Sequence, residues 1–180
     1  EVMIVMLGSA WAVLISAGRG EVVDFDALAR HAHKLRLCLD VWNPEPEVRL
    51  DMLDKAEIAS PHIAGYALQA KWRGTRMIYA AAADFFSLPL KNVPDPIARP
   101  HLNFELARNW GEVVLGVVDP RADHARMLAA LKGCDKRSPA FDRLRKEYPV
   151  RHEFAFAVIH APRLEVDDRR VLLRLGFELT

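Results

Sequence analysis

Glu45 and His62 are two side chains of the kinds that move protons in enzymes, and they lie seventeen positions apart in the stretch LDVWNPEPEVRLDMLDKAEIASPHIAGY. Pro44 and Pro46 flank the glutamate, and Pro61 precedes the histidine. Because proline fixes its own backbone angle and restricts the residue before it, these neighbours favour side chains held in one place. A carboxylate beside an imidazole favours the charged ring and orients it, so an acid–base pair is one interpretation.

Two more polar residues, Arg19 and Asp40, come at or after the ends of expected strands. Arg19 lies between two glycines, where a guanidinium could hold a substrate carboxylate by two hydrogen bonds. Asp40 could accept a hydrogen bond from a cofactor amide. Ligands of open α/β sheets bind at the carboxyl ends of the strands, so we expect these two residues, with Glu45 and His62, at one sheet edge.

Each of these residues also has an ordinary structural interpretation. Arg19 could be exposed in a glycine turn, and Asp40 could cap the end of a strand. The sequence NPEP is a common turn composition, and His62 could be a loop histidine with satisfied hydrogen bonds. Convergence on one sheet edge favours the chemical interpretation, but spacing alone leaves the reaction open.

Apolar runs and helical repeats alternate in the first half of the chain, which predicts an α/β layer with a mostly parallel sheet. The expected strands are 11–17, 35–40 and 57–60. The expected helices are 26–33, with Asp24 or Asp26 as N-cap, and 47–56.

A longer helix over 67–86 follows, and its apolar residues recur at helical spacing. The stripe expected to pack is Leu68, Trp72, Thr75, Tyr79, Ala82 and Phe86. Four prolines in SLPLKNVPDPIARPH then exclude regular structure, which predicts a domain boundary. The expected domains are 1–90, a linker over 91–101, and a smaller α/β domain over 102–180. In that domain we expect strands at 112–119, 153–160 and 177–180 and helices at 122–132, 138–148 and 167–176.

Composition narrows the class of protein. Hydrophobic residues make up 51% and charged residues 27% of the 180 positions, as in globular proteins, and a net charge of +1 selects neither nucleic acid nor membrane. Cys38 and Cys134 form no disulfide framework, which favours a reducing compartment and predicts the cytoplasm.

Three other patterns favour structural interpretations. The apolar start, EVMIVMLGSAWAVLIS, lacks a basic region and is too short to span a bilayer, so buried strands fit it better. The basic stretch 134–152 lacks aromatic residues spaced for base stacking and is interpreted as a solvated helix face. No histidine shows metal-ligand spacing with cysteine or acidic residues, so no metal is predicted.

Several segments carry a resemblance to a known family. GRGEVVDFDAL, LDVWNPEP and SPHIAGY, in this order, resemble the second half of the nucleotide-binding domain of D-isomer-specific 2-hydroxyacid dehydrogenases. SPHIAGYALQAKWRGT, FDRLRKEYPVRHEFAFAVI and LLRLGF are similar to the erythronate-4-phosphate dehydrogenase branch, which carries its own carboxyl-terminal dimerisation domain. The resemblance extends from about Gly8 onward and implies part of a Rossmann-type domain followed by a small α/β dimerisation domain.

The resemblance also implies roles for particular residues. Catalytic roles are implied for Arg19, Glu45 and His62. Contacts with NAD are implied for Ala17, Gly18, Arg19, Asp40 and Gly65. Contacts with a phosphorylated substrate are implied for Tyr66 and Arg19. The implied reaction of the homodimer is oxidation of 4-phospho-D-erythronate at C2, giving 2-oxo-3-hydroxy-4-phosphobutanoate on the route to pyridoxal phosphate.

The sequence departs from the family pattern in four respects. It contains no G-x-G-x-x-G phosphate-binding turn and nothing that matches the family's separate substrate domain. Ser16 stands where the family usually has asparagine, and the segment between Arg19 and Asp40 is short. Two alternatives therefore stay open: a non-catalytic dimerisation fragment, and a dehydrogenase for another small 2-hydroxy acid such as phosphoglycerate.

Overall fold

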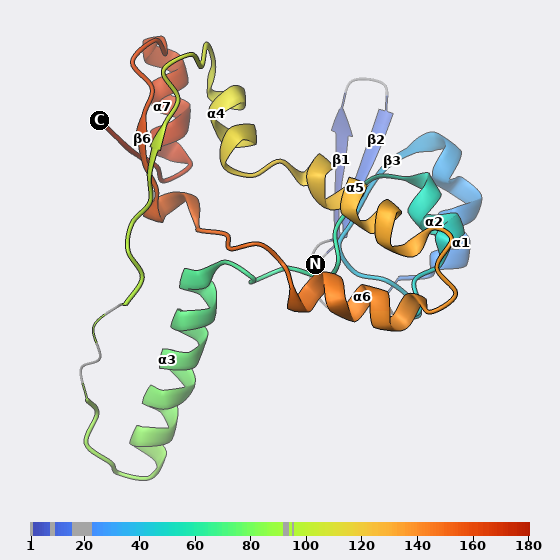
Figure 1. The fold of residues 1–180 in the computed structure, drawn as a ribbon, viewed down its shortest axis with the longest axis horizontal. Helices are drawn as coiled ribbons and strands as arrows, with labels where there is room; N and C mark the ends of the chain where they lie inside the picture. Colours follow the sequence, from blue (N-terminus) through green and yellow to red (C-terminus); the bar gives the residue numbers. More distant parts are fainter. Residues whose placement is uncertain (1, 8–9, 16–22, 92–93, 95) are drawn as a thin grey trace. The chain divides into compact units, whose positions relative to one another are not determined.

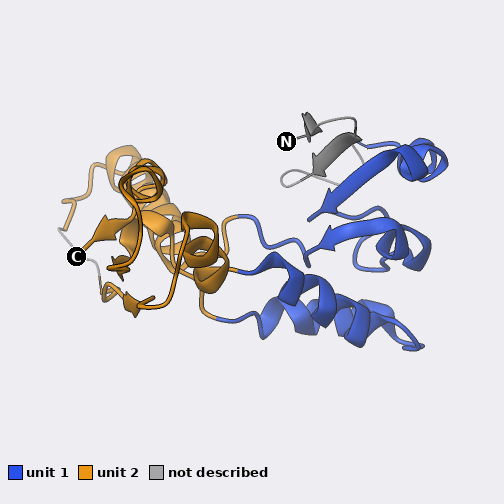
Figure 2. Cartoon of the chain, turned by 90° about the horizontal axis from the view of Figure 1, so that it is seen from above, with its two compact units in different colours: residues 1–64, 119–149 blue, residues 65–118, 150–180 orange. Residues whose placement is uncertain are grey.

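The computed structural model describes residues 2–7, 10–15, 23–91, 94 and 96–180. The chain divides into two compact units, one formed by residues 1–64 and 119–149 and the other by residues 65–118 and 150–180 (Figure 2). We call these unit 1 and unit 2.

Unit 1 is built on a four-stranded sheet in the order β1-β2-β3-β4. Its first three strands are labelled in Figure 1. Its strands are β1 (Val2–Leu7), β2 (Ala10–Ile15), β3 (Leu35–Leu39) and β4 (Ala56–Ala59). β1 pairs antiparallel with β2, whereas β2 with β3 and β3 with β4 pair parallel. The parallel pairs are connected through helix α1 (Phe25–His31), which continues into the 3-10 turn Ala32–Lys34, and through α2 (Leu50–Lys55). The predicted α/β class with a mostly parallel sheet is therefore confirmed.

Local sequence accounts for these elements. Asp24 is the N-cap of α1, and its carboxylate accepts a hydrogen bond from the Ala27 N–H at 2.8 Å. The two inward-facing leucines of β3, Leu37 and Leu39, are fully buried. Met52 and Leu53 of α2 are equally buried in the same core, so the short helix is held by packing.

Two helices from the second half of the chain complete this core. α5 (Pro120–Leu131) begins at the N-cap Asp119, and α6 (Arg137–Lys146) follows it. Met127, Leu131 and Phe141 are fully buried in the hydrophobic cluster that contains the β3 leucines.

The compact units therefore differ from the division expected at the proline-rich segment. Residues 119–149 belong to unit 1 instead of forming part of one separate domain over 102–180. An amphipathic pattern says that a helix needs an apolar partner but not which partner it has, so this pairing could not be predicted. The assignment of nucleotide-binding and dimerisation domains stays a prediction.

Unit 2 contains a three-stranded sheet, β5-β6-β7, in which both pairings are parallel. Its strands are β5 (His101–Asn103), β6 (Val158–His160) and β7 (Glu178–Leu179), and its helices are α3 (Leu68–Phe85), α4 (Trp110–Val117) and α7 (Val166–Arg174). Val113, Ile159 and Leu172 are fully buried in its core.

The expected strand over 112–119 is wrong, because these residues form most of α4. Asn109 is the N-cap and accepts a hydrogen bond from the Glu112 N–H at 3.0 Å, while the Glu112 carboxylate accepts one from the Arg108 N–H at 2.8 Å. These contacts resemble a capping box: they satisfy the Glu112 N–H in the first turn and fix the residue before the N-cap, and they outweigh the strand preference of the valines. The expected strand over 153–160 is also shorter than predicted, because Phe154–Phe156 form a 3-10 turn.

Among the described residues, the stripe expected to pack on the long helix is not buried. In α3 only Gln69 and Ala83 are buried, and Tyr79 of the predicted stripe is exposed. Helical periodicity thus predicted the helix but not how its apolar residues are packed.

In the part of the chain that the structure describes, no helix is both long and apolar enough to cross a membrane.

Candidate functional site

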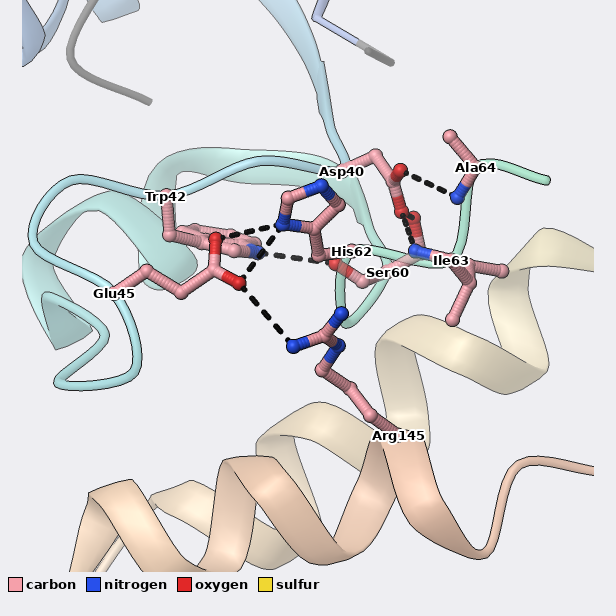
Figure 3. Close-up of polar contacts among 8 residues, drawn as sticks. All are labelled: Asp40, Trp42, Glu45, Ser60, His62, Ile63, Ala64 and Arg145. Carbon is pink, nitrogen blue, oxygen red and sulfur yellow. Dashed lines mark hydrogen bonds and ion pairs between the residues drawn. The ribbon is translucent and has the colours of Figure 1, made fainter. Parts of the chain in front are cut away.

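Asp40 fastens the loop that carries His62. The carboxylate directly follows β3, is 7% exposed, and accepts three hydrogen bonds from the loop after β4. Oδ1 accepts from the Ser60 hydroxyl at 2.6 Å and from the Ile63 N–H at 2.8 Å, and Oδ2 accepts from the Ala64 N–H at 3.0 Å (Figure 3). Hydrogen bonds to an ionised carboxylate are stronger than neutral ones, so the loop is held on both sides of His62.

Trp42 supports the same loop from a second side. The residue is 1% exposed, and its indole Nε1–H donates to the Ser60 carbonyl at 3.0 Å. The backbone of Ser60 is also fixed, since its N–H donates to the Leu39 carbonyl at 2.9 Å. The loop therefore leaves β4 in one defined direction.

Within this loop His62 has a left-handed backbone with φ of 54°. A residue with a Cβ adopts this region at a cost, and the surrounding hydrogen bonds must maintain it. Its imidazole Nδ1 lies 2.8 Å from Oε1 and 3.0 Å from Oε2 of Glu45. The two side chains are 29% and 20% exposed, so the pair is partly shielded from water.

The orientation of this pair decides which ring nitrogen can react. When Nδ1 carries the proton and donates it to the Glu45 carboxylate, Nε2 presents a lone pair. The His62 ring can then accept a proton at Nε2 while Glu45 steadies the resulting positive charge. The predicted Glu45–His62 pair is brought together, and Asp40 adjoins it through the loop.

The other residues expected at the site are placed as follows. Ala17, Gly18 and Arg19, together with Ser16, lie outside the described residues. Gly65 and Tyr66 begin unit 2, where Gly65 has φ of 75° and the Tyr66 ring lies 4.0 Å from the Lys71 ammonium. Among the described residues, no group of three or more His, Cys, Asp or Glu could hold a metal ion.

Arg145 was not expected at the site from the sequence. Its Nη1 lies 3.8 Å from Oε1 of Glu45, and it reaches this position from α6 (Figure 3). It belongs to the basic stretch interpreted as a solvated helix face. Nothing in the local sequence distinguishes it from Arg143, because only the packing of α6 brings it to the loop.

Comparisons with known proteins find several erythronate-4-phosphate dehydrogenases that are similar to this chain. The chain is 41% identical over 154 residues to the erythronate-4-phosphate dehydrogenase of Marinobacter nauticus, covering 78% of this chain and 40% of that protein. It is 42% identical over 155 residues to the enzyme of the same name from Proteus mirabilis, covering 79% of this chain and 40% of that protein. It is 39% identical over 178 residues to the enzyme of the same name from Edwardsiella ictaluri, covering 92% of this chain and 45% of that protein.

No protein-family model matches the chain. The chain spans 40 to 45% of the length of these three relatives. By sequence the chain is thus a relative of the erythronate-4-phosphate dehydrogenases, over most of its own length and less than half of theirs.

Proposed function

We propose that this chain supplies the acid–base centre of an NAD-dependent dehydrogenase that oxidises 4-phospho-D-erythronate at C2. The product is 2-oxo-3-hydroxy-4-phosphobutanoate, an intermediate on the route to pyridoxal phosphate. The observation that carries the proposal is the contact of His62 Nδ1 with the Glu45 carboxylate at 2.8 and 3.0 Å on the loop held by Asp40. The names of the relatives supply the substrate.

The residues of the chain divide the reaction between them. His62 takes the C2 hydroxyl proton at Nε2, and Glu45 stabilises the imidazolium that forms. Arg19 holds the substrate carboxylate by two hydrogen bonds, an assignment that rests on the resemblance alone. Tyr66 contacts the substrate on the same basis. NAD, when bound, accepts the hydride from C2, and the protein's task is to orient the two reactants.

The residues described around Asp40 fit a nicotinamide group. Among the described residues Oδ2 accepts one hydrogen bond, from the Ala64 N–H, and a carboxylate oxygen can accept two. Asp40 can therefore take a further hydrogen bond from a carboxamide N–H. Gly65 is assigned to NAD by the resemblance. Ala17 and Gly18 are assigned to NAD by resemblance alone.

We further propose that the protein is a homodimer through residues 102–180 and that it acts in the cytoplasm. The first rests on the resemblance of FDRLRKEYPVRHEFAFAVI and LLRLGF to a dimerisation domain. The cytoplasmic location rests on the cysteines, because Cys38 and Cys134 are free thiols, as is usual in a reducing compartment.

Turnover of 4-phospho-D-erythronate with NAD tests the function, with NADH formation as the measurement. His62→Asn keeps a hydrogen-bonding side chain but cannot accept the proton, so kcat should fall about 100- to 10,000-fold. His33→Asn, at an exposed histidine of the same unit, is the control and should leave kcat unchanged. A near-normal kcat in the His62 variant would reject the acid–base role.

Two further measurements separate the alternatives. Failure of the chain to bind NADH in a fluorescence titration would favour a non-catalytic dimerisation fragment. Faster oxidation of 3-phosphoglycerate than of 4-phospho-D-erythronate would keep the enzyme class and change the substrate.

A further inference from the structure

Helix α6 is fixed against the loop that carries Glu45. Phe141, in the middle of the helix, is fully buried in the core of unit 1. At the start of α6, Arg137 Nη2 lies 2.7 Å from Oε1 of Glu47, and the Ser138 hydroxyl donates to the same carboxylate. The helix therefore has a defined position relative to residues 43–49.

The spacing along α6 then directs Arg145 toward Glu45. Arg137, Phe141 and Arg145 are four residues apart in succession, so their side chains lie on one face of the helix. On this face Arg137 pairs with Glu47 and Arg145 pairs with Glu45.

Arg145 approaches the pair from the side opposite to the reacting nitrogen. Its Nη1 is 3.8 Å from Oε1 of Glu45, the same oxygen that lies 2.8 Å from His62 Nδ1. Since Nδ1 faces Glu45, the substrate must approach Nε2, on the far side of the ring. The side chains of Arg145 and Glu45 are 33% and 20% exposed, so their attraction is only partly screened by water.

We propose that Arg145 is a positioning residue that acts through Glu45 on His62, an inference that rests on the proposed function. Its permanent positive charge holds the carboxylate in the orientation that receives Nδ1–H. Without Arg145 the carboxylate has more freedom to turn, and the imidazole is less often oriented for proton transfer. The residue does not contact the substrate, so its loss affects kcat and leaves KM for 4-phospho-D-erythronate unchanged.

A pair of matched variants on α6 tests this role. Arg145→Gln should lower kcat about two- to fivefold, the range of a partly exposed ion pair, with KM unchanged. Arg143→Gln removes the same charge from an exposed position two residues away and should have no effect. In a Glu45→Gln background, Arg145→Gln should cause no further loss, because the carboxylate through which it acts is gone. Equal kcat values for the Arg145 and Arg143 variants, or full additivity with Glu45→Gln, would overturn the proposal.

A second readout does not depend on turnover. Nitrogen-15 spectra of the histidine rings, recorded at one pH, report how His62 is hydrogen-bonded. The His62 signals should move in Arg145→Gln and stay in place in Arg143→Gln. Unchanged His62 signals in Arg145→Gln would reject the link even in an active enzyme. If the His62 signals move in Arg145→Gln but the wild-type chain shows no turnover, the link is supported and the proposed function is rejected.

Arg145→Lys is a control for loss of activity through misfolding. Lysine keeps the charge and the helix but cannot offer the planar guanidinium, so this variant should recover part of the loss in kcat and in the His62 signals. A lysine variant that folds and behaves like the glutamine variant would contradict a role for the positive charge.

Discussion

Replacement of Asp40 by asparagine should release the loop that holds His62. Asparagine has nearly the same shape, but it offers one acceptor oxygen and an NH2 group that can only donate. The carboxylate of Asp40 meets three donors, from Ser60, Ile63 and Ala64. At least one donor must therefore face the NH2 group, and the remaining hydrogen bonds lose the help of a negative charge.

The magnitude follows from the burial and the number of bonds. Asp40 is 7% exposed, so water cannot readily replace a lost acceptor. A hydrogen bond to a charged group contributes about 1.5 to 3 kcal/mol, and an unsatisfied buried donor costs a similar amount. We expect local opening of the loop to become easier by about 2 to 3 kcal/mol, which corresponds to about 30- to 150-fold in an equilibrium constant.

Amide hydrogen exchange measures this opening directly. The Ile63 and Ala64 amides should exchange about 30- to 150-fold faster in Asp40→Asn than in the wild-type chain. Asp54→Asn is the control, because the Asp54 side chain is 50% exposed and pairs with Lys132 on the surface. Exchange in Asp40→Asn within about threefold of the control would refute the argument that Asp40 holds the loop.

The remaining predictions concern other parts of the chain. Gly116→Ala should lower the free energy of unfolding by about 1 to 3 kcal/mol because its Cβ would overlap the Phe104 ring. Gly74→Ala, in α3, should instead raise it by up to about 1 kcal/mol, because the added Cβ would meet no atom of the described residues within 4 Å. Denaturant titration of both variants measures the contrast, and equal changes in the free energy of unfolding would contradict it. Burial lowers the pKa of His124 below its usual 6.5, so its contribution to stability is present above pH 6.5 and is lost as the pH falls through the depressed value. In His124→Gln the urea midpoint of unfolding should therefore fall less between neutral and acidic pH than in the wild-type chain. An equal fall in both chains would contradict this prediction. Burial raises the pKa of the Cys38 thiol, so iodoacetamide should modify it more slowly than a free cysteine peptide at about pH 8, as mass spectrometry of the labelled peptide can show.

Local chemistry alone predicted most elements of unit 1. Alternating apolar and amphipathic segments indicated β3, α2 and β4 in their order, because burial on two faces and helical periodicity leave distinct patterns. Prediction failed at α4, where a strand was expected. There the capping contacts of Asn109 and Glu112 outweigh the preference of valine for strands.

At the candidate site, too, some features could be predicted from local sequence and others could not. Glu45 and His62 could be selected from the sequence because their types, their proline neighbours and their place after strands are local properties. Their contact was an expectation until the fold placed the two loops together. The role of Asp40 in holding the loop was not expected, since a carboxylate's hydrogen-bond partners more than twenty positions away leave no mark in its own neighbourhood.

Residue types and local patterns were sufficient to identify the residues that could carry the chemistry and the segments that form the parallel sheet of unit 1. In contrast, the packing of α5 and α6 into the core of that sheet, and the contact of Arg145 instead of Arg143 with Glu45, follow from the tertiary fold. The physical reason is that an apolar stripe or a charged side chain specifies a kind of partner, whereas packing of the whole core selects the one that it meets.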